Sequence, residues 1–120
     1  MNQAEIGQHG EDAAAAYLER IGMSGIDRNW RDGRGELDIV ALEGASLVIC
    51  EVKTRRGTAH GTPEEAVSVA KQRRLTRLAK SYVAANGLDP CGVRFDVISI
   101  VVIAPDRALL RHHRAAFEAV

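Results

Sequence analysis

Two short runs in the first half of the chain alternate like β-strands but place charges among apolar residues. They are residues 35–40, which carry Glu36 and Asp38, and residues 48–53, which carry Glu51 and Lys53. Successive side chains of a strand point to opposite faces, so the two acids of the first run share a face, and Glu51 shares one with Lys53. Charges on mostly buried strands are costly unless they are paired or bind a metal. The two runs therefore predict a divalent-metal site suited to phosphodiester cleavage.

Between these runs, Gly44 and Ala45 form a two-residue hairpin loop, with glycine first as a type II′ turn requires. The register that this loop sets pairs Glu43 with Ser46, Asp38 with Glu51 and Glu36 with Lys53. Directly opposed residues have Cβ atoms about 4.5–5.5 Å apart, and like charges there are destabilising. An aspartate opposite a glutamate therefore predicts a cation between them.

Length and charge limit the class of protein. The 120 residues suffice for one domain, and the 46% hydrophobic and 27% charged residues are ordinary for a globular protein. The 16 basic and 16 acidic residues give a formal net charge of zero, so a surface for nucleic acid requires segregated charge. The sequence shows no signal pattern and no apolar run that could span a bilayer. Cys50 reads as a reduced core residue, which fits a cytoplasmic protein.

The other periodicities predict further helices and strands. Residues 3–21 form an amphipathic helix that Gly22 ends, with Glu11 at the border of its apolar face. Residues 26–31 suit a short edge strand.

A second, longer helix follows a polar loop at residues 54–61. Its start has the signature of a capping box, formed by Thr62, Pro63 and Glu65. It runs to about residue 85, and a β-branched strand at residues 93–103 follows it. Strand, helix and strand in this order make a right-handed crossover with a parallel pair. We therefore expect a single α/β domain with a mixed central sheet flanked by helices, and from residue 106 only a short strand and a turn.

Phosphodiester hydrolysis requires an activated water and neutralisation of charge on the phosphate, which a hard cation such as Mg²⁺ or Mn²⁺ supplies. Asp38 and Glu51 are the obvious ligands, and the carbonyl of Val52 is a third. Lys53 positions or deprotonates the attacking water, or stabilises charge at the phosphorus. Glu11 is a further ligand or water-positioning group if the first helix packs across this face.

The second helix adds basic candidates. Its inward arc consists of Val67, Leu75, Leu78, Ala79, Tyr82 and Val83. Lys71 falls within this arc, and buried lysines are rare unless paired. It either reaches the acidic site or the scissile phosphate, or extends its stem along the core. The other bases either form a solvated face or contact phosphates. On the helix these bases are Arg73, Arg74, Arg77 and Lys80, and on strands they are Arg55, Arg56 and Arg94.

The charged groups also have structural interpretations. Glu36 and Asp38 can be solvated acids of an edge strand, and Glu51 and Lys53 can form an exposed face with ion pairs to Glu36, worth only about 0–1 kcal/mol. Glu36 otherwise belongs to the site itself. Asp96 has mostly apolar neighbours, which favours a structural hydrogen-bonding role. No usual zinc spacing is formed by the histidines, which are His9, His60, His112 and His113.

Asp38 followed by Glu51-Val52-Lys53 resembles the signature of the PD-(D/E)xK nuclease superfamily, in its form without the leading proline. The whole chain resembles more closely the YraN family of bacterial proteins, whose fold is similar to archaeal Holliday-junction resolvases. The matching stretches are residues 7–11, 28–31, 35–40, 51–55, 71–75 and 94–97.

This resemblance implies a restriction-endonuclease-like fold with Asp38, Glu51 and Lys53 as the catalytic core and Glu11 as the helix acid of resolvase-like members. It implies a Mg²⁺-dependent endonuclease acting on DNA, including branched or flapped structures, and it allows a homodimer. The alternative is a non-catalytic nucleic-acid-binding module that keeps the fold. A third interpretation is a structural protein whose acids form ion pairs.

Overall fold

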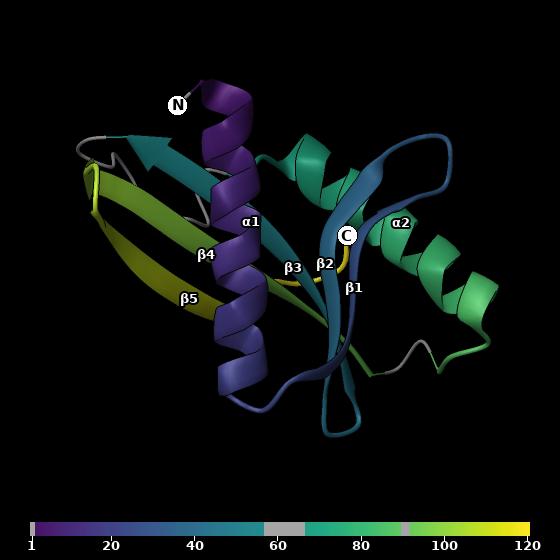
Figure 1. Ribbon diagram of the computed structural model, residues 1–120. Helices are drawn as coiled ribbons and strands as arrows, with labels where there is room; N and C mark the ends of the chain where they lie inside the picture. The colour runs from purple at the N-terminus through teal and green to yellow at the C-terminus, as the bar shows by residue number, and fades with distance from the viewer. Residues whose placement is uncertain (1, 57–66, 90–91) are drawn as a thin grey trace.

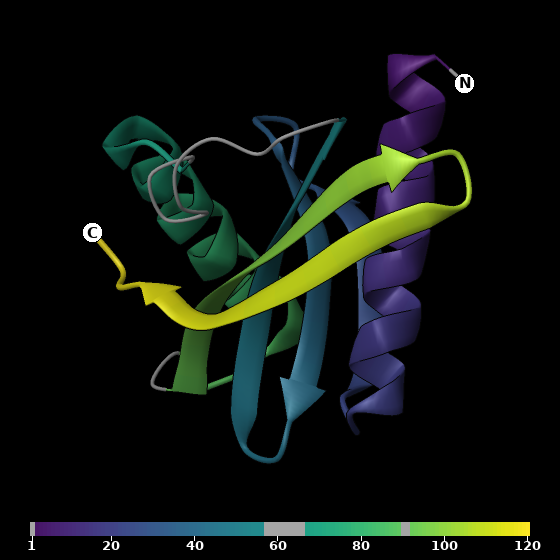
Figure 2. The ribbon, with the colours of Figure 1, turned by 90° about the vertical axis from the view of Figure 1, so that its left-hand side faces the viewer.

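The computed structural model describes residues 2–56, 67–89 and 92–120. It shows a five-stranded mixed sheet with one helix on each face (Figures 1 and 2). The elements are α1 (Gln3–Arg20), β1 (Ser24–Arg31), β2 (Glu36–Glu43), β3 (Ser46–Arg56), α2 (Val69–Asn86), β4 (Val93–Ala104) and β5 (Arg107–Phe117). The expected α/β class is confirmed, and the arrangement is compatible with a restriction-endonuclease-like fold.

The strands lie in the order β1-β2-β3-β4-β5. All neighbours are antiparallel except β3 and β4, which are parallel and are separated in the chain by α2, as predicted for a strand-helix-strand unit. The predicted hairpin register is confirmed at the turn, where Glu43 pairs with Ser46. Gly44 at this turn has a φ of 58°, which glycine adopts at no steric cost.

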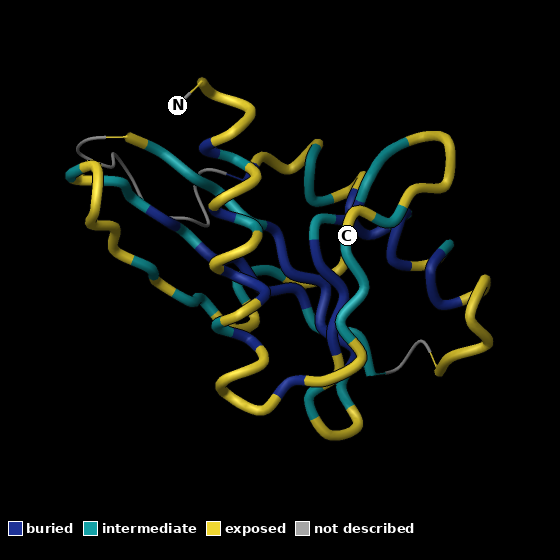
Figure 3. Tube along the Cα trace, in the orientation of Figure 1, coloured by how far each residue is buried: buried dark blue, intermediate teal, exposed yellow. Residues whose placement is uncertain are grey.

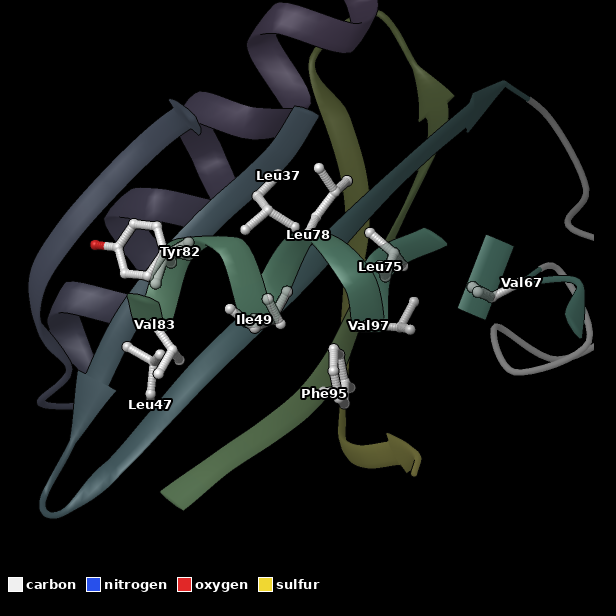
Figure 4. Packing of buried hydrophobic residues seen from close by; sticks show 12 residues of the cluster. Leu37, Leu47, Ile49, Val67, Leu75, Leu78, Tyr82, Val83, Phe95 and Val97 are labelled. Carbon is white, nitrogen blue, oxygen red and sulfur yellow. The ribbon is translucent and has the colours of Figure 1, made fainter. Parts of the chain in front are cut away.

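Each face of the sheet has its own apolar core. On the α2 side, Leu37, Ile49 and Val97 of the sheet pack with Leu75 and Leu78 of the helix (Figure 4). On the α1 side, the cluster consists of Ala14, Ala15, Leu18, Met23, Ile39, Ala41, Val48, Cys50, Ile98 and Ile100. The centre of the sheet is therefore buried on both faces (Figure 3), so any charge placed there needs a partner.

Helix α1 begins where the side chain of Asn2 caps it by accepting a 2.8 Å hydrogen bond from the Glu5 amide. It ends at Arg20, one residue earlier than expected. Gly10 faces the sheet so closely that a Cβ atom there would lie 1.9 Å from Oγ1 of Thr54 on β3. This close approach sets the position of Glu11, the next residue.

The predicted start of the second helix is wrong. Ser68 is extended, with ψ 159°, and its side chain caps α2 by accepting a hydrogen bond from the Lys71 amide. A continuous helix from residue 62 to residue 85 is therefore excluded, while Thr62, Pro63 and Glu65 lie outside the described residues. The expected end is confirmed, because α2 stops at Asn86 and Gly87 is left-handed. The apolar arc predicted for this helix is buried as expected.

The edge strands are longer than the sequence predicted. β1 begins at Ser24 instead of residue 26, and β5 runs for 11 residues, where only a short strand and a turn were expected. β5 has few buried apolar residues, so its alternation is weak, and its pairing with β4 holds it in place instead. Neither helix in the described part of the chain has an apolar stretch long enough to cross a membrane.

Candidate metal centre

The candidate site lies where the sheet divides into two branches. The β2–β3 ladder ends at the pair Ile39–Cys50. Beyond it, β2 continues beside β1, while β3 continues beside β4 as far as the pair Arg56–Val102 (Figure 1). We call this division the fork. A fork leaves backbone groups without ladder partners, and such groups need other ones.

Asp38 is the first β2 residue past the last β2–β3 pair. Its Oδ2 accepts a 2.9 Å hydrogen bond from the Val52 amide on β3, so its carboxylate supplies a partner that the ladder no longer provides. In an extended strand the N–H and C=O of one residue point to the same side. The carbonyl of Val52 therefore also points into the fork.

Three of the predicted acids come together here. One carboxylate oxygen each of Glu11, Glu36 and Asp38 lies within 4.8 Å of the others. Glu51, which is only 5% exposed, lies close enough to Asp38 to share a hydrogen bond and to repel its charge. Residues from α1, β2 and β3 thus direct four carboxylates to one place.

The position of Glu36 differs from the predicted one. Between β2 and β3 the pairing ends before Glu36 reaches Lys53, so the expected cross-strand pair is absent from the described residues. Glu36 instead pairs with Arg31 of β1, whose Nε donates a 2.8 Å hydrogen bond to it. The prediction assumed that β2 and β3 pair along the whole hairpin, whereas their ladder ends at the fork.

Asn29 of β1 is a site residue that sequence reasoning missed. Its Nδ2 donates hydrogen bonds of 2.9 Å to Glu11 and 2.7 Å to Glu36. Its φ of 55° lies in the left-handed region, which asparagine tolerates better than most residues. Two signals were available in the sequence: an asparagine within a strand pattern, where propensity disfavours it, and its place in the matching stretch 28–31.

The surroundings of Asp38 at the fork disfavour its ionised form. Burial raises the pKa of Asp38 to about 8, and the neighbouring carboxylates of Glu51 and Glu11 add to the increase. The hydrogen bond from Val52 opposes this effect without cancelling it. A cation bound beside Asp38 would favour its ionised form, because a nearby opposite charge lowers the pKa of a carboxyl group.

Two lysines border the acids on the α2 side. Lys71, from the first turn of α2, forms an ion pair with Glu51, so its predicted approach to the acidic site is what the structure shows. Lys53 has a lowered pKa, chiefly because of burial and then because of the nearby Lys71 charge. Both lysines therefore lie beside Glu51 at the fork.

The predicted arginines are less concentrated. Arg55 follows Lys53 by two residues on the same face of β3, while Arg56 points to the α1 side. Arg74 is exposed and Arg77 half-buried on α2, beyond the Lys71 turn, and neither contacts the four acids. These residues surround the fork without forming part of it.

A second charged cluster has a structural role. Asp96 is completely buried and accepts hydrogen bonds from Arg94, from Nε2 of His112 at 2.7 Å and from the Ala115 amide. Burial alone would raise the pKa of Asp96, but these hydrogen bonds outweigh it and lower the pKa to about 2. The expected hydrogen-bonding role of Asp96 is confirmed. Arg94 also binds Glu43, so its guanidinium is occupied within the fold.

The donor set at the fork fits a hard divalent cation. Mg²⁺ and Mn²⁺ prefer carboxylate and carbonyl oxygens, and they are held by one to three such groups together with waters and substrate oxygens. Asp38, Glu51 and the carbonyl of Val52 offer this set, with Glu11 and Glu36 beside it. No histidine or cysteine contributes to the cluster of described residues, so a soft-metal site is not what these groups form.

The fold and the fork together define an α/β domain with a helix on each face of its sheet and an acidic centre between the sheet branches. A family model described as uncharacterised protein family UPF0102 matches residues 10–100. The chain therefore belongs to the UPF0102 family, which confirms the predicted YraN-type membership.

Individual relatives match over nearly the whole chain. A UPF0102 protein of Syntrophotalea carbinolica is 50% identical over 113 residues, which cover 94% of this chain and 91% of that protein. A UPF0102 protein of Rhodococcus opacus is 48% identical over 112 residues, covering 93% and 95%. One of Geobacter sulfurreducens is 46% identical over 113 residues, covering 94% and 88%.

Proposed function

We propose that this protein is a Mg²⁺- or Mn²⁺-dependent endonuclease of the PD-(D/E)xK type that hydrolyses phosphodiester bonds in DNA. The observation that carries the proposal is the convergence of Asp38, Glu51 and Glu11 at the fork with Lys53 beside them. A purely structural protein gains nothing from holding repelling carboxylates in one buried place, because their burial is costly.

Asp38, Glu51 and the Val52 carbonyl hold the cation in this proposal, and Glu11 positions the attacking water. When bound, the cation neutralises charge on the phosphate and makes its water more acidic. Glu36 and Asn29 keep the carboxylate of Glu11 oriented toward the site. The backbone hydrogen bond from Val52 fixes the rotamer of Asp38.

Lys53 is the residue that contacts the reacting phosphate. Its lowered pKa makes loss of a proton easier, which suits a group that accepts a proton from water. In its charged form it stabilises the negative charge that develops on the phosphate oxygens. Both roles require it to face the phosphate from the Glu51 side of β3, where alternation places it.

The test is cleavage of labelled nicked, branched and single-stranded DNA and RNA with Mg²⁺ or Mn²⁺. We expect DNA cleavage by the wild-type protein and a loss of at least about 100-fold in Asp38→Ala and in Glu51→Ala. Glu19→Ala is the matched control, because Glu19 is exposed at the far end of α1. Binding of DNA without cleavage in any metal would favour the non-catalytic module instead.

A further inference from the structure

A row of side chains leads from the fork across β3, β4 and β5 on the α2 side of the sheet. The strand pairing places Lys53 beside Ser99, and Ser99 beside Arg111. The next row in the same direction places Arg55 beside Val101, and Val101 beside Leu109. We call the surface formed by these six residues the β3–β5 face.

The orientation of this face follows from its neighbours. On β5, His112 points to the α1 side, where its Nδ1 lies 3.1 Å from the hydroxyl of Tyr17. Because alternate residues of a strand face opposite ways, Leu109 and Arg111 point to the α2 side. On β3, Thr54 meets α1 at Gly10, so Lys53 and Arg55 also point to the α2 side.

The face carries positive charge without acids. Its titratable members are Lys53, Arg55 and Arg111, and all are basic. Glu51, one row closer to the fork, is engaged by Lys71. Arg111 is exposed and forms no ion pair with any residue in the described ranges. An exposed cation such as Arg111, on a face whose other titratable members, Lys53 and Arg55, are half-buried bases, suits a polyanion as partner.

The face also exposes apolar surface between its charges. Leu109 is 52% exposed and Val101 is half-buried beside it. A duplex turns its phosphates outward and its bases inward, so it would leave these apolar groups without a partner. A single strand offers both phosphates for the cations and base faces for the apolar groups.

We propose that the β3–β5 face binds an unpaired nucleic-acid strand that continues from the phosphate held at the fork. This inference rests on the proposed function, because the fork supplies the point from which the strand leaves. Strands of a sheet are about 4.8 Å apart, so Arg111 lies about 10 Å from Lys53 across two of them. This span brings Arg111 to the next phosphates along the strand and Ser99 between the two cations. The preferred substrates are then DNA structures with an unpaired arm or overhang.

The test is binding of a labelled oligothymidylate, and of a matched duplex, in EDTA, where no cleavage takes place. We expect Arg111→Ala to weaken binding of the single strand about tenfold and to reduce the slope of log affinity against log salt by about one. Leu109→Ser, which keeps every charge, should weaken single-strand binding and leave the salt slope unchanged. Arg20→Ala is the control, because it removes another exposed arginine, at the end of α1.

Equal affinities of Arg111→Ala and Arg20→Ala for the single strand would overturn the inference, as would tighter binding of the duplex. Absence of any binding would overturn it as well. These results are distinct from failure of the proposed function, because cleavage with Mn²⁺ is measured separately on the same proteins. A protein that cuts DNA but binds it independently of Arg111 would refute only the β3–β5 face.

Discussion

The ammonium group of Lys71 contacts the carboxylate of Glu51, joining the first turn of α2 to the middle of β3. The carboxylate is nearly buried, so the lysine supplies much of its compensation in the metal-free protein. Glu51 thus contacts Lys71 and also lies close enough to Asp38 to share a hydrogen bond with it.

Replacing Lys71 should therefore weaken the metal-free fold and make it depend on a cation. We expect Lys71→Met to lower the free energy of unfolding by about 2 kcal/mol in EDTA, because a buried charge loses its partner. Added Mn²⁺ should restore more stability to this variant than to the wild type. Urea unfolding with and without Mn²⁺ measures both effects. Lys80→Met, an exposed change on the same helix, should stay within about 0.5 kcal/mol, and an equal loss in both variants would refute the role of the ion pair.

Asp38 should make the metal-free protein less stable as pH rises. Its pKa is about 8 in the folded protein against an ordinary value of 3.8, so the folded state holds this proton more tightly than the unfolded state. The contribution is complete below about pH 4 and is lost as pH rises to about 8. Asp38→Asn should remove this slope and raise the free energy of unfolding at pH 7 by at least about 1 kcal/mol in EDTA. A decrease in stability would mean that the Asp38 charge has a structural partner.

Gly10 should be the position where α1 tolerates a side chain least. A Cβ at Gly10 would meet Thr54 Oγ1 at 1.9 Å, whereas a Cβ at Gly7 would meet nothing within 4 Å. We expect Gly10→Ala to destabilise the fold by about 1–3 kcal/mol and to displace Glu11 from the acids. Gly7→Ala in the same helix should stabilise it by about 0.5–1 kcal/mol. Thermal unfolding of the pair tests the packing, and similar behaviour of both variants would contradict it.

Two substitutions at Asn29 can separate the stability that comes from its hydrogen bonds from the cost of its left-handed backbone. Asn29→Gly removes the amide that joins Glu11 and Glu36 but tolerates the φ of 55°. We expect this variant to lose about 1 kcal/mol of stability, and Asn29→Ala to lose about 1 kcal/mol more because of its left-handed backbone. Chemical denaturation distinguishes the two, and equal stabilities would show that the backbone is not strained.

Asp96 should determine stability at low pH. Its pKa is lowered to about 2 in the folded protein, so its contribution is present above about pH 4 and is lost as the pH falls through 2. Asp96→Asn should lower the free energy of unfolding at pH 7 by about 2 kcal/mol or more, because Arg94 and His112 lose a charged acceptor. It should also flatten the acid limb of the stability profile. If Asp96→Asn loses as much stability at low pH as the wild type, other carboxylates cause that loss.

Much of the fold follows from local patterns in the sequence. The alternation of residues 35–40 and 48–53, the glycine turn at Gly44 and the helix stop at Gly87 each correspond to one structural event. β5 was harder to predict because its length depends on pairing with β4 and hardly on its own apolar residues. The start of α2 was missed because the capping residues of Thr62 and those of Ser68 give similar signals in sequence.

The candidate site was predictable in its members and not in its geometry. Asp38, Glu51 and Lys53 stand out because charges interrupt buried strands, and Glu11 because it borders an apolar face. The β2–β3 ladder ends at Ile39–Cys50 while β3 stays paired with β4, and no spacing in the sequence indicated this end. That event separates Glu36 from Lys53 and brings Asn29 to the acids.

The central claim is that the fork binds a divalent cation through Asp38 and Glu51. Isothermal titration of the metal-free protein with Mn²⁺ measures this directly, without a nucleic-acid substrate. We predict saturable binding to the wild type and to Glu19→Gln, and its loss in Glu51→Gln and Asp38→Asn. Equal Mn²⁺ affinity in the wild type and in both fork variants, or no saturable binding to the wild type, would contradict the account.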